Sequence, residues 1–307
     1  MSSTDISSPS PTRLRRRSGK ASTRWLRSSM EDGLVREVAL VIGAILAYFT
    51  IRNVTAGAPG AAFANGEHIV DVEQWLGVRW EDTIQAAIVG RDGLVMLANW
   101  IYIWGHWPVI LSTAVVLHTW RRDRYYLLRN TLFISGGIGF VFFAFLPVAP
   151  PRLLELGLVD TVSNQSNAYR ALQPPGLTNQ YASFPSLHVG WNLAVGIVLF
   201  MTTTHVVVRS FAVLSPLAMT FAVVATANHF VIDILGGAAV VLVGLAGAHI
   251  IEQERSLSVA TLARDGPAIH DEVPRRRVAP VPRRTPRRES PPGPSRRGAP
   301  QADPCRS

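Results

Sequence analysis

The chain has 307 residues, 48% of them hydrophobic, and a formal net charge of +9. The apolar residues gather into long blocks almost free of charge, whereas a soluble core would spread them along the chain. The arginine clusters stand outside these blocks, a placement typical of membrane-flanking segments rather than of nucleic-acid binding. The only cysteine, Cys305, lies near the C-terminus, which excludes an internal disulfide and a cysteine-based metal site.

Composition divides the chain into three segments. Residues 1–32 are rich in Ser and Arg, and residues 255–307 are rich in Pro and Arg. Neither segment has enough apolar residues for a core, so both are predicted to be disordered tails. Residues 33–254 hold the apolar blocks and are predicted to form one membrane-embedded domain.

Six stretches approach the roughly 20 residues that a helix needs to cross a bilayer. Hydrocarbon offers no partner for an unpaired backbone amide, so the spans are expected to be helical. The predicted fold is therefore an all-α, polytopic bundle of about six transmembrane helices. The spans are expected at 34–55, 93–117, 130–148, 187–207, 211–226 and 230–251.

Basic connectors set the expected orientation, because positively charged loops stay in the cytoplasm. The most basic short loop is 120–129, and placing it inside also places both tails inside. The loops at 56–92, at 149–186 and around residue 228 then face outward. The predicted location is the cell membrane, with multiple spans and the chemistry on the extracytoplasmic face.

Two features near the first span leave alternatives open. Ala62-Phe63-Ala64 resembles a signal-peptidase site, so the first span is either retained or removed by cleavage. Residues 69–89 mix charges with apolar residues, which predicts an amphipathic helix at the outer interface rather than a span.

The stretch from Asn228 to Asp233 carries ionisable groups at the start of the last apolar block. His229 and Asp233 are four residues apart and share one helix face. The carboxylate is expected to orient the imidazole and to raise the basicity of its other nitrogen, as for an activated nucleophile. The alternative is a structural polar pair that ties two helices together. Gly236 and Gly237 follow and would let another helix approach closely.

A second stretch, Phe184-Pro185-Ser186-Leu187-His188, precedes the fourth span. Ser186 is a plausible N-cap, and the free amides of such a helix end suit a phosphate. His188 could donate a proton to a departing oxygen. The alternative is an ordinary helix cap with an interfacial histidine.

Arg152 stands at the outer end of the third span and offers a two-pronged donor for phosphate oxygens. The alternative is an ordinary interfacial arginine. The predicted topology brings Arg152, His188, His229 and Asp233 to the same outer level.

These motifs together resemble the type 2 phosphatidic acid phosphatase superfamily, and within it the inositolphosphotransferase branch that includes inositol phosphorylceramide synthase. The resemblance rests on FPSLH at 184–188, NHFVID at 228–233 and APPR at 149–152, and it covers about residues 35–250. Asn99-Trp100-Ile101-Tyr102 and His106-Trp107-Pro108 also look like this branch.

The resemblance implies a covalent mechanism that needs neither metal nor other cofactor. His229 would attack phosphorus to form a phosphohistidine, with Asp233 orienting its ring. His188 would protonate the leaving oxygen and Arg152 would bind phosphate. Water or an alcohol would then discharge the phosphoenzyme.

The chain departs from the phosphatase pattern at three positions, two of which are cationic in the pattern. Phe145 replaces a lysine, and Ala222 and Val223 replace a Ser-Arg pair. Tyr102, His106 and Asn228 are candidate replacements for binding substrate, although a packing role is equally open for each.

Three functions therefore compete. The favoured one is a phosphotransferase acting on a lipid phosphate or phosphodiester, with inositol or another alcohol as acceptor. A lipid phosphate phosphatase, with water as acceptor, shares the covalent step. A non-catalytic transporter or scaffold is the third, although a transporter is expected to show internal repeats and the sequence shows none. The expected partners are the lipid substrate and membrane lipids; the sequence leaves the oligomeric state open.

Overall fold

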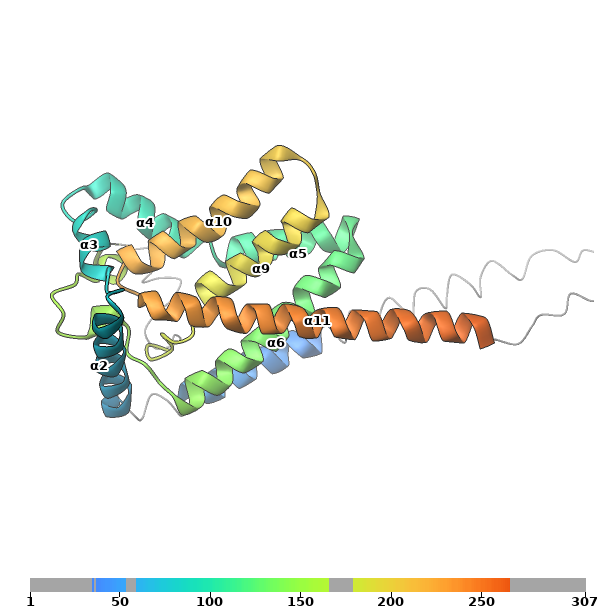
Figure 1. Ribbon diagram of the computed structural model, residues 1–307, viewed down its shortest axis with the longest axis horizontal. Helices are drawn as coiled ribbons and strands as arrows, with labels where there is room; N and C mark the ends of the chain where they lie inside the picture. Colours follow the sequence, from blue (N-terminus) through green and yellow to red (C-terminus); the bar gives the residue numbers. More distant parts are fainter. Residues whose placement is uncertain (1–34, 36, 54–58, 166–178, 266–307) are drawn as a thin grey trace, which may run out of the picture. The chain divides into compact units, whose positions relative to one another are not determined.

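The computed structural model describes residues 35, 37–53, 59–165 and 179–265, and these fold into helices (Figure 1). Residues 37–53 form the first helical stretch. It is followed by α2 (Pro59–Leu76), α3 (Glu81–Ala86), α4 (Asp92–Trp104), α5 (Trp107–Trp120), α6 (Arg122–Phe145), the short 3-10 turn η1 (Pro151–Leu153), α7 (Thr161–Gln165), α9 (Leu187–Thr202), α10 (Val206–Ala225) and α11 (Val231–Asp265). Among the described residues, extended pairing is limited to one parallel bridge between Val148 and Ala182. The all-α prediction is confirmed.

Three helices of the described part are long and apolar enough to cross a membrane: α6, α10 and the Val231–Ser258 part of α11. The helix α9 is apolar but shorter, with 16 residues. At 1.5 Å per residue it measures about 24 Å, less than the ~30 Å hydrocarbon core. The last four predicted spans thus each coincide with a helix.

The second predicted span is not one straight helix. The helices α4 and α5 pass the same test only as a pair, with a bend of 44° between them. Pro108 lies in the first turn of α5. It has no amide to donate to the carbonyl four residues earlier and its ring clashes with that carbonyl, which explains the break.

Other boundaries also differ from the prediction. The segment 69–89 is not one helix: α2 ends at Leu76 because Gly77 adopts a positive φ of 67°, and α3 begins only at Glu81. The helix α11 continues to Asp265, ten residues past the boundary predicted at 255. The remainder of both predicted tails, and residues 166–178 of the predicted outer loop, lie outside the described residues.

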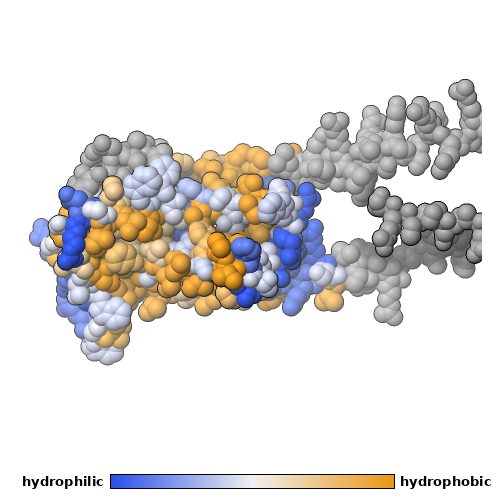
Figure 2. All heavy atoms as spheres, turned by 90° about the horizontal axis from the view of Figure 1, so that it is seen from above, coloured by the Kyte–Doolittle hydropathy of each residue, from blue (hydrophilic) through white to orange (hydrophobic). Residues whose placement is uncertain are grey.

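The surface matches a membrane environment. Figure 2 shows hydrophobic residues predominating over the central part of the described body, with hydrophilic residues gathered towards its ends. Large apolar side chains of α4, α5 and α10 are exposed, among them Trp100, Val115 and Leu217 at 60%, 64% and 60%. Exposed apolar patches of this extent mark contact with lipid or protein. The apolar helices therefore indicate insertion into a membrane.

The described parts of the loops predicted to face outward gather at one end of the bundle. Backbone hydrogen bonds connect them: Ala149 N to Ala62 O (2.9 Å), Val148 N to Tyr181 O (2.8 Å) and Arg152 N to Ala227 O (2.9 Å). The side of the membrane that this end faces stays a prediction. Ala62, part of the possible cleavage site, is fully buried within α2.

The glycines of α11 allow α9 and α11 to approach closely, as predicted. A Cβ atom added to Gly237 would stand 2.2 Å from the carbonyl oxygen of Ser186. One added to Gly190 would stand 2.6 Å from the carbonyl oxygen of Gly237. No side chain fits at such a contact, so these glycines bring the N-terminal ends of the two helices side by side.

Candidate active site

A tight turn between α10 and α11 carries His229. Ala227 lies in the left-handed region with φ of 54°, a conformation that costs a residue with a side chain roughly 1–2 kcal/mol. The backbone amides of Asn228 and His229 both donate to the carbonyl oxygen of Val223, at 3.0 and 3.2 Å. The turn therefore fixes His229 just before the first residue of α11.

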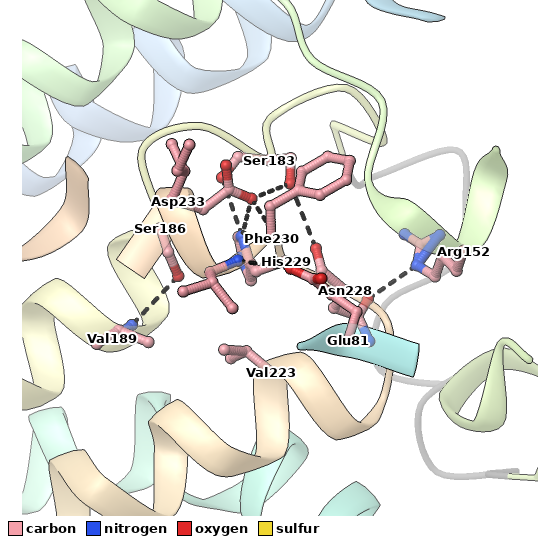
Figure 3. A network of polar contacts seen from close by, with 12 residues as sticks. Glu81, Arg152, Ser183, Ser186, Val189, Val223, Asn228, His229, Phe230 and Asp233 are labelled. Carbon is pink, nitrogen blue, oxygen red and sulfur yellow. Dashed lines mark hydrogen bonds and ion pairs between the residues drawn. The ribbon is translucent and has the colours of Figure 1, made fainter. Parts of the chain in front are cut away.

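The hydrogen bonds of His229 define which ring nitrogen is free to react. Its Nδ1 lies 2.9 Å from the carbonyl oxygen of Ser183 and 3.2 Å from Oδ2 of Asp233 (Figure 3). Both partners are oxygens, and a carbonyl oxygen can only accept. Nδ1 must therefore carry the hydrogen, which leaves the lone pair on Nε2.

Asp233 is itself held by several donors. Its Oδ2 accepts from the Ser183 hydroxyl and from the backbone amide of Phe230 at 2.9 Å. Its backbone carbonyl accepts from the amide of Ser186 at 2.9 Å. The side chain is fully buried. The carboxylate thus joins the 179–186 segment, the turn before α11 and the imidazole in one network.

Ser186 and His188 lie beside this network. The hydroxyl of Ser186 accepts from the amide of Val189 at 3.4 Å, which is the predicted N-cap of α9. The ring of His188 lies 5.6 Å from that of His229, centroid to centroid. The ring of Tyr102 is stacked on that of His188, with centroids 4.7 Å apart. The structure therefore brings His188, His229 and Asp233 together.

His106 lies next to His188, with ring centroids 4.3 Å apart. The Ser215 hydroxyl donates to Oδ1 of Asn192, whose amide nitrogen donates to the carbonyl of His188 at 2.9 Å and faces Nδ1 of His106 at 3.4 Å. Nδ1 of His106 thus accepts a hydrogen bond from the Asn192 amide, and the imidazole of His106 carries its hydrogen on Nε2. His106 contacts the site through His188.

Arg152 is aimed by neighbouring side chains. Its Nε donates to Oδ1 of Asn228 at 2.8 Å, and its Nη1 lies 3.8 Å from Oδ2 of Asp160. The amide nitrogen of Asn228 donates in turn to the Thr226 hydroxyl at 2.9 Å. Asn228 was one of the candidate replacements for the missing cations. Its polar atoms are already engaged, and it holds Arg152 next to the residue that precedes His229.

The three departing positions contribute no charge to the site. Phe145 is 84% exposed at the end of α6, and Ala222 and Val223 are fully buried in α10. Of the family's cationic positions, only Arg152 holds a cation here.

Comparison with known families agrees with this arrangement. A family model described as the PAP2 superfamily matches residues 67–247. The chain belongs to the PAP2 superfamily. No curated protein and no solved structure matched the chain in the same comparisons. The match runs from α2 into α11 and includes all eight predicted site residues. Membership in the PAP2 superfamily indicates an enzyme of the phosphatase or phosphotransferase type that acts on lipid phosphates.

Several residues of this PAP2 site were not found from the sequence. Ser183 acts through its carbonyl oxygen, which no side-chain pattern reveals. Asn192 follows His188 by four residues in an apolar helix, a polar position that could have been noticed. Glu73 and Glu81 lie in the segment interpreted only as interfacial, and both reach the start of α11.

Proposed function

We propose that this PAP2 member is a phosphotransferase acting on a lipid phosphodiester through a phosphohistidine at His229. The phosphoryl group, which keeps its second ester bond, moves to an alcohol, inositol or another. The observation that carries the proposal is the pair of contacts at Nδ1 of His229, from which its tautomer is inferred. Its Nδ1–H is held by the Ser183 carbonyl and Asp233, so a lone pair stands ready on Nε2. A fixed lone pair with an anionic orienting group is the requirement for a nucleophilic histidine.

The reaction divides into two displacements at phosphorus. In the first, Nε2 of His229 forms a bond to phosphorus while the bond from phosphorus to the lipid oxygen breaks, and His188 gives its proton to that oxygen. In the second, the acceptor hydroxyl attacks phosphorus and passes its proton to His188. The phosphorus–nitrogen bond breaks and its electron pair returns to Nε2. Asp233 stabilises the positive ring during the covalent stage.

The charge of the site favours a phosphodiester over a phosphomonoester. A monoester carries nearly two negative charges at neutral pH, and a diester carries one. Arg152 is the one cationic position of the family pattern that this chain keeps, and Asp160 already offsets part of its charge. A single arginine fork suits the two free oxygens of a diester. The same losses are tolerated in the inositolphosphotransferase branch, to which we assign the chain.

The first experiment identifies donor and acceptor. The purified chain is incubated with radiolabelled lipid phosphodiesters and monoesters, with and without inositol, and the products are separated. We expect a labelled product that depends on the alcohol and on the diester. Release of inorganic phosphate from a monoester, unaffected by alcohols, would instead identify a lipid phosphate phosphatase.

The second experiment tests the histidines. His229→Ala is expected to abolish turnover and the acid-labile phosphoenzyme, whereas His205→Ala, at an exposed histidine outside the site, should change neither. His188→Ala should slow expulsion of an alkoxide by about 100- to 10,000-fold but matter little for nitrophenolate, which leaves without a proton. Full activity of all site variants would show that these histidines are structural polar groups and not the catalytic residues. Absence of turnover in the wild type with every donor and acceptor would favour the scaffold or transporter.

The site is proposed to face the extracytoplasmic side of the cell membrane. The support is the basic segment 120–129 at the other end of α6, which is expected to stay in the cytoplasm. The structure makes 122–129 the first turns of α6 and not the loop that was predicted. The substrate would then be a lipid of the outer leaflet.

A further inference from the structure

Two buried glutamates reach the start of α11 from the neighbouring outer helices. Glu73 of α2 is fully buried, and its Oε1 accepts from the backbone amide of Ile232 at 2.8 Å. Glu81 of α3 is 2% exposed, and its Oε1 accepts from the amide of Val231 at 2.8 Å. The next amide in line, that of Phe230, donates to Asp233. Three carboxyl groups thus cap three successive amides that α11 cannot satisfy internally.

The hydrogen bonds to Ile232 and Val231 leave one carboxyl oxygen of each glutamate, Oε2, unused. Oε2 of Glu73 and Oε2 of Glu81 are both buried and have no hydrogen-bond partner among the described residues when both groups are treated as ionised. The two side chains are within hydrogen-bonding contact. One proton on Glu73, donated to Oε2 of Glu81, satisfies both oxygens.

The electrostatic surroundings place this proton on Glu73 at neutral pH. Burial is the largest cause and raises the pKa of Glu73 to about 8, and the nearby Glu81 and Asp233 act in the same direction. The amide of Ile232 opposes this rise. The charged groups that act on Glu73 are Glu81 from α3 and Asp233 from α11, and both are acidic. Protonation of Glu73 therefore also removes repulsion among the three carboxylates.

We propose that Glu73 and Glu81 form a proton-sharing carboxyl pair that holds the first turn of α11, and so positions His229 and Asp233 for nucleophilic attack. The role in attack rests on the function proposed above. Neither glutamate contacts His229, so both are positioning residues. They fasten α2 and α3 to the start of α11, directly after the turn that carries the nucleophile. Loss of the shared proton would place three negative groups close together there.

The test is the pH dependence of phosphoenzyme formation, measured as the burst of nitrophenolate from a nitrophenyl phosphodiester. This leaving group needs no proton, so the burst reports on His229 rather than on His188. The wild-type burst rate is expected to fall above pH about 8, approaching tenfold per pH unit. Glu73→Gln keeps an acceptor for Ile232 and a donor for Glu81, so its burst rate should equal that of the wild type at pH 7 and stay level to pH 9.

A matched control and a more severe variant complete the test. Glu67→Gln, at an exposed glutamate of the same helix, should keep the wild-type pH profile. Glu73→Ala leaves the Ile232 amide without its acceptor and should lower the burst rate at least about tenfold at every pH. An alkaline fall that persists in Glu73→Gln, or a Glu73→Ala burst equal to the wild type, overturns the proposal.

Unfolding separates this proposal from the function it rests on. A group whose pKa is higher in the folded state contributes stability below its unfolded pKa, and that stability is lost as pH rises through the folded value. The midpoint of thermal unfolding should therefore decline from pH 5 to 8 in the wild type and less in Glu73→Gln. Equal declines refute the shared proton whatever the reaction is, whereas a phosphoenzyme surviving in His229→Ala refutes the proposed function alone.

Discussion

Replacing Asp233 by Asn tests how the imidazole of His229 is held. In serine-protease triads the corresponding change costs about 10,000-fold because the ring turns to the wrong tautomer. Here the Ser183 carbonyl accepts from the same Nδ1–H at 2.9 Å, so the tautomer has a second support. The amide oxygen of Asn can replace Oδ2, and its nitrogen would occupy the position of Oδ1, which has no partner among the described residues.

The expected loss follows from the charge alone. Hydrogen bonds to charged groups contribute about 1.5–3 kcal/mol against about 0.5–1.5 kcal/mol for neutral ones. The imidazole becomes positive as the phosphoenzyme forms, and the negative carboxylate stabilises that charge. Asp233→Asn removes this stabilisation, up to the full value of a hydrogen bond to a charged group. It should therefore slow phosphoenzyme formation by about 10- to 100-fold. The fold should remain, because Phe230 and Ser183 keep an acceptor.

The assay is the nitrophenolate burst, with the thermal midpoint measured alongside. Asp123→Asn, at an exposed aspartate near the start of α6, is the matched control and should change neither quantity. A loss near 10,000-fold would show that the Ser183 carbonyl does not hold the tautomer. A loss below about threefold would remove Asp233 from the mechanism altogether.

Three further outcomes are expected. Gly237→Ala should lower the free energy of unfolding in denaturant titrations by about 1–3 kcal/mol, because its Cβ would lie 2.2 Å from a backbone carbonyl oxygen. The control Gly137→Ala, which has open space around it, should leave the free energy of unfolding unchanged. Deleting 266–307 should leave turnover per folded molecule nearly unchanged; a large loss in a correctly inserted protein would reveal a functional element in the tail. In that truncated chain, which lacks the only native cysteine, a cysteine at Glu155 should react with an impermeant reagent in intact cells and one at Asp123 only after permeabilisation. The reverse labelling would invert the topology.

The helices of the bundle could be predicted because backbone amides find no hydrogen-bond partner in hydrocarbon except within the chain. Long uncharged blocks must form helices there, and α6, α10 and α11 each coincide with such a block. Boundaries were less predictable, since charge does not end a helix: α11 continues through Glu252 and Arg255. The break before Pro108 could have been predicted, because proline interrupts a helix. The continuous hydropathy of 93–117 predicted a single span instead.

The residues proposed for the chemistry could be chosen from the sequence because ionisable groups are costly in apolar segments, so few candidates exist. Their spacing predicted the contact of His229 with Asp233, four residues apart. The predicted shared helix face was wrong, because His229 lies in the turn before α11, which begins at Val231. The proximity of His188 followed from topology, and the closeness of α9 to α11 followed from the glycines.

The sequence by itself determined the fold class and the helix that bears Asp233, because these depend on local hydropathy and on the cost of polar groups in lipid. It also carried the motifs on which the family resemblance rests. Only the tertiary structure decided which nitrogen of His229 is free, since that depends on the backbone carbonyl of Ser183, 46 positions earlier in the chain. It also decided that Asn228 aims Arg152, and that Glu73 and Glu81 cap α11 from helices more than a hundred positions away. Such contacts are set by packing between distant segments, and no local pattern in the sequence encodes them.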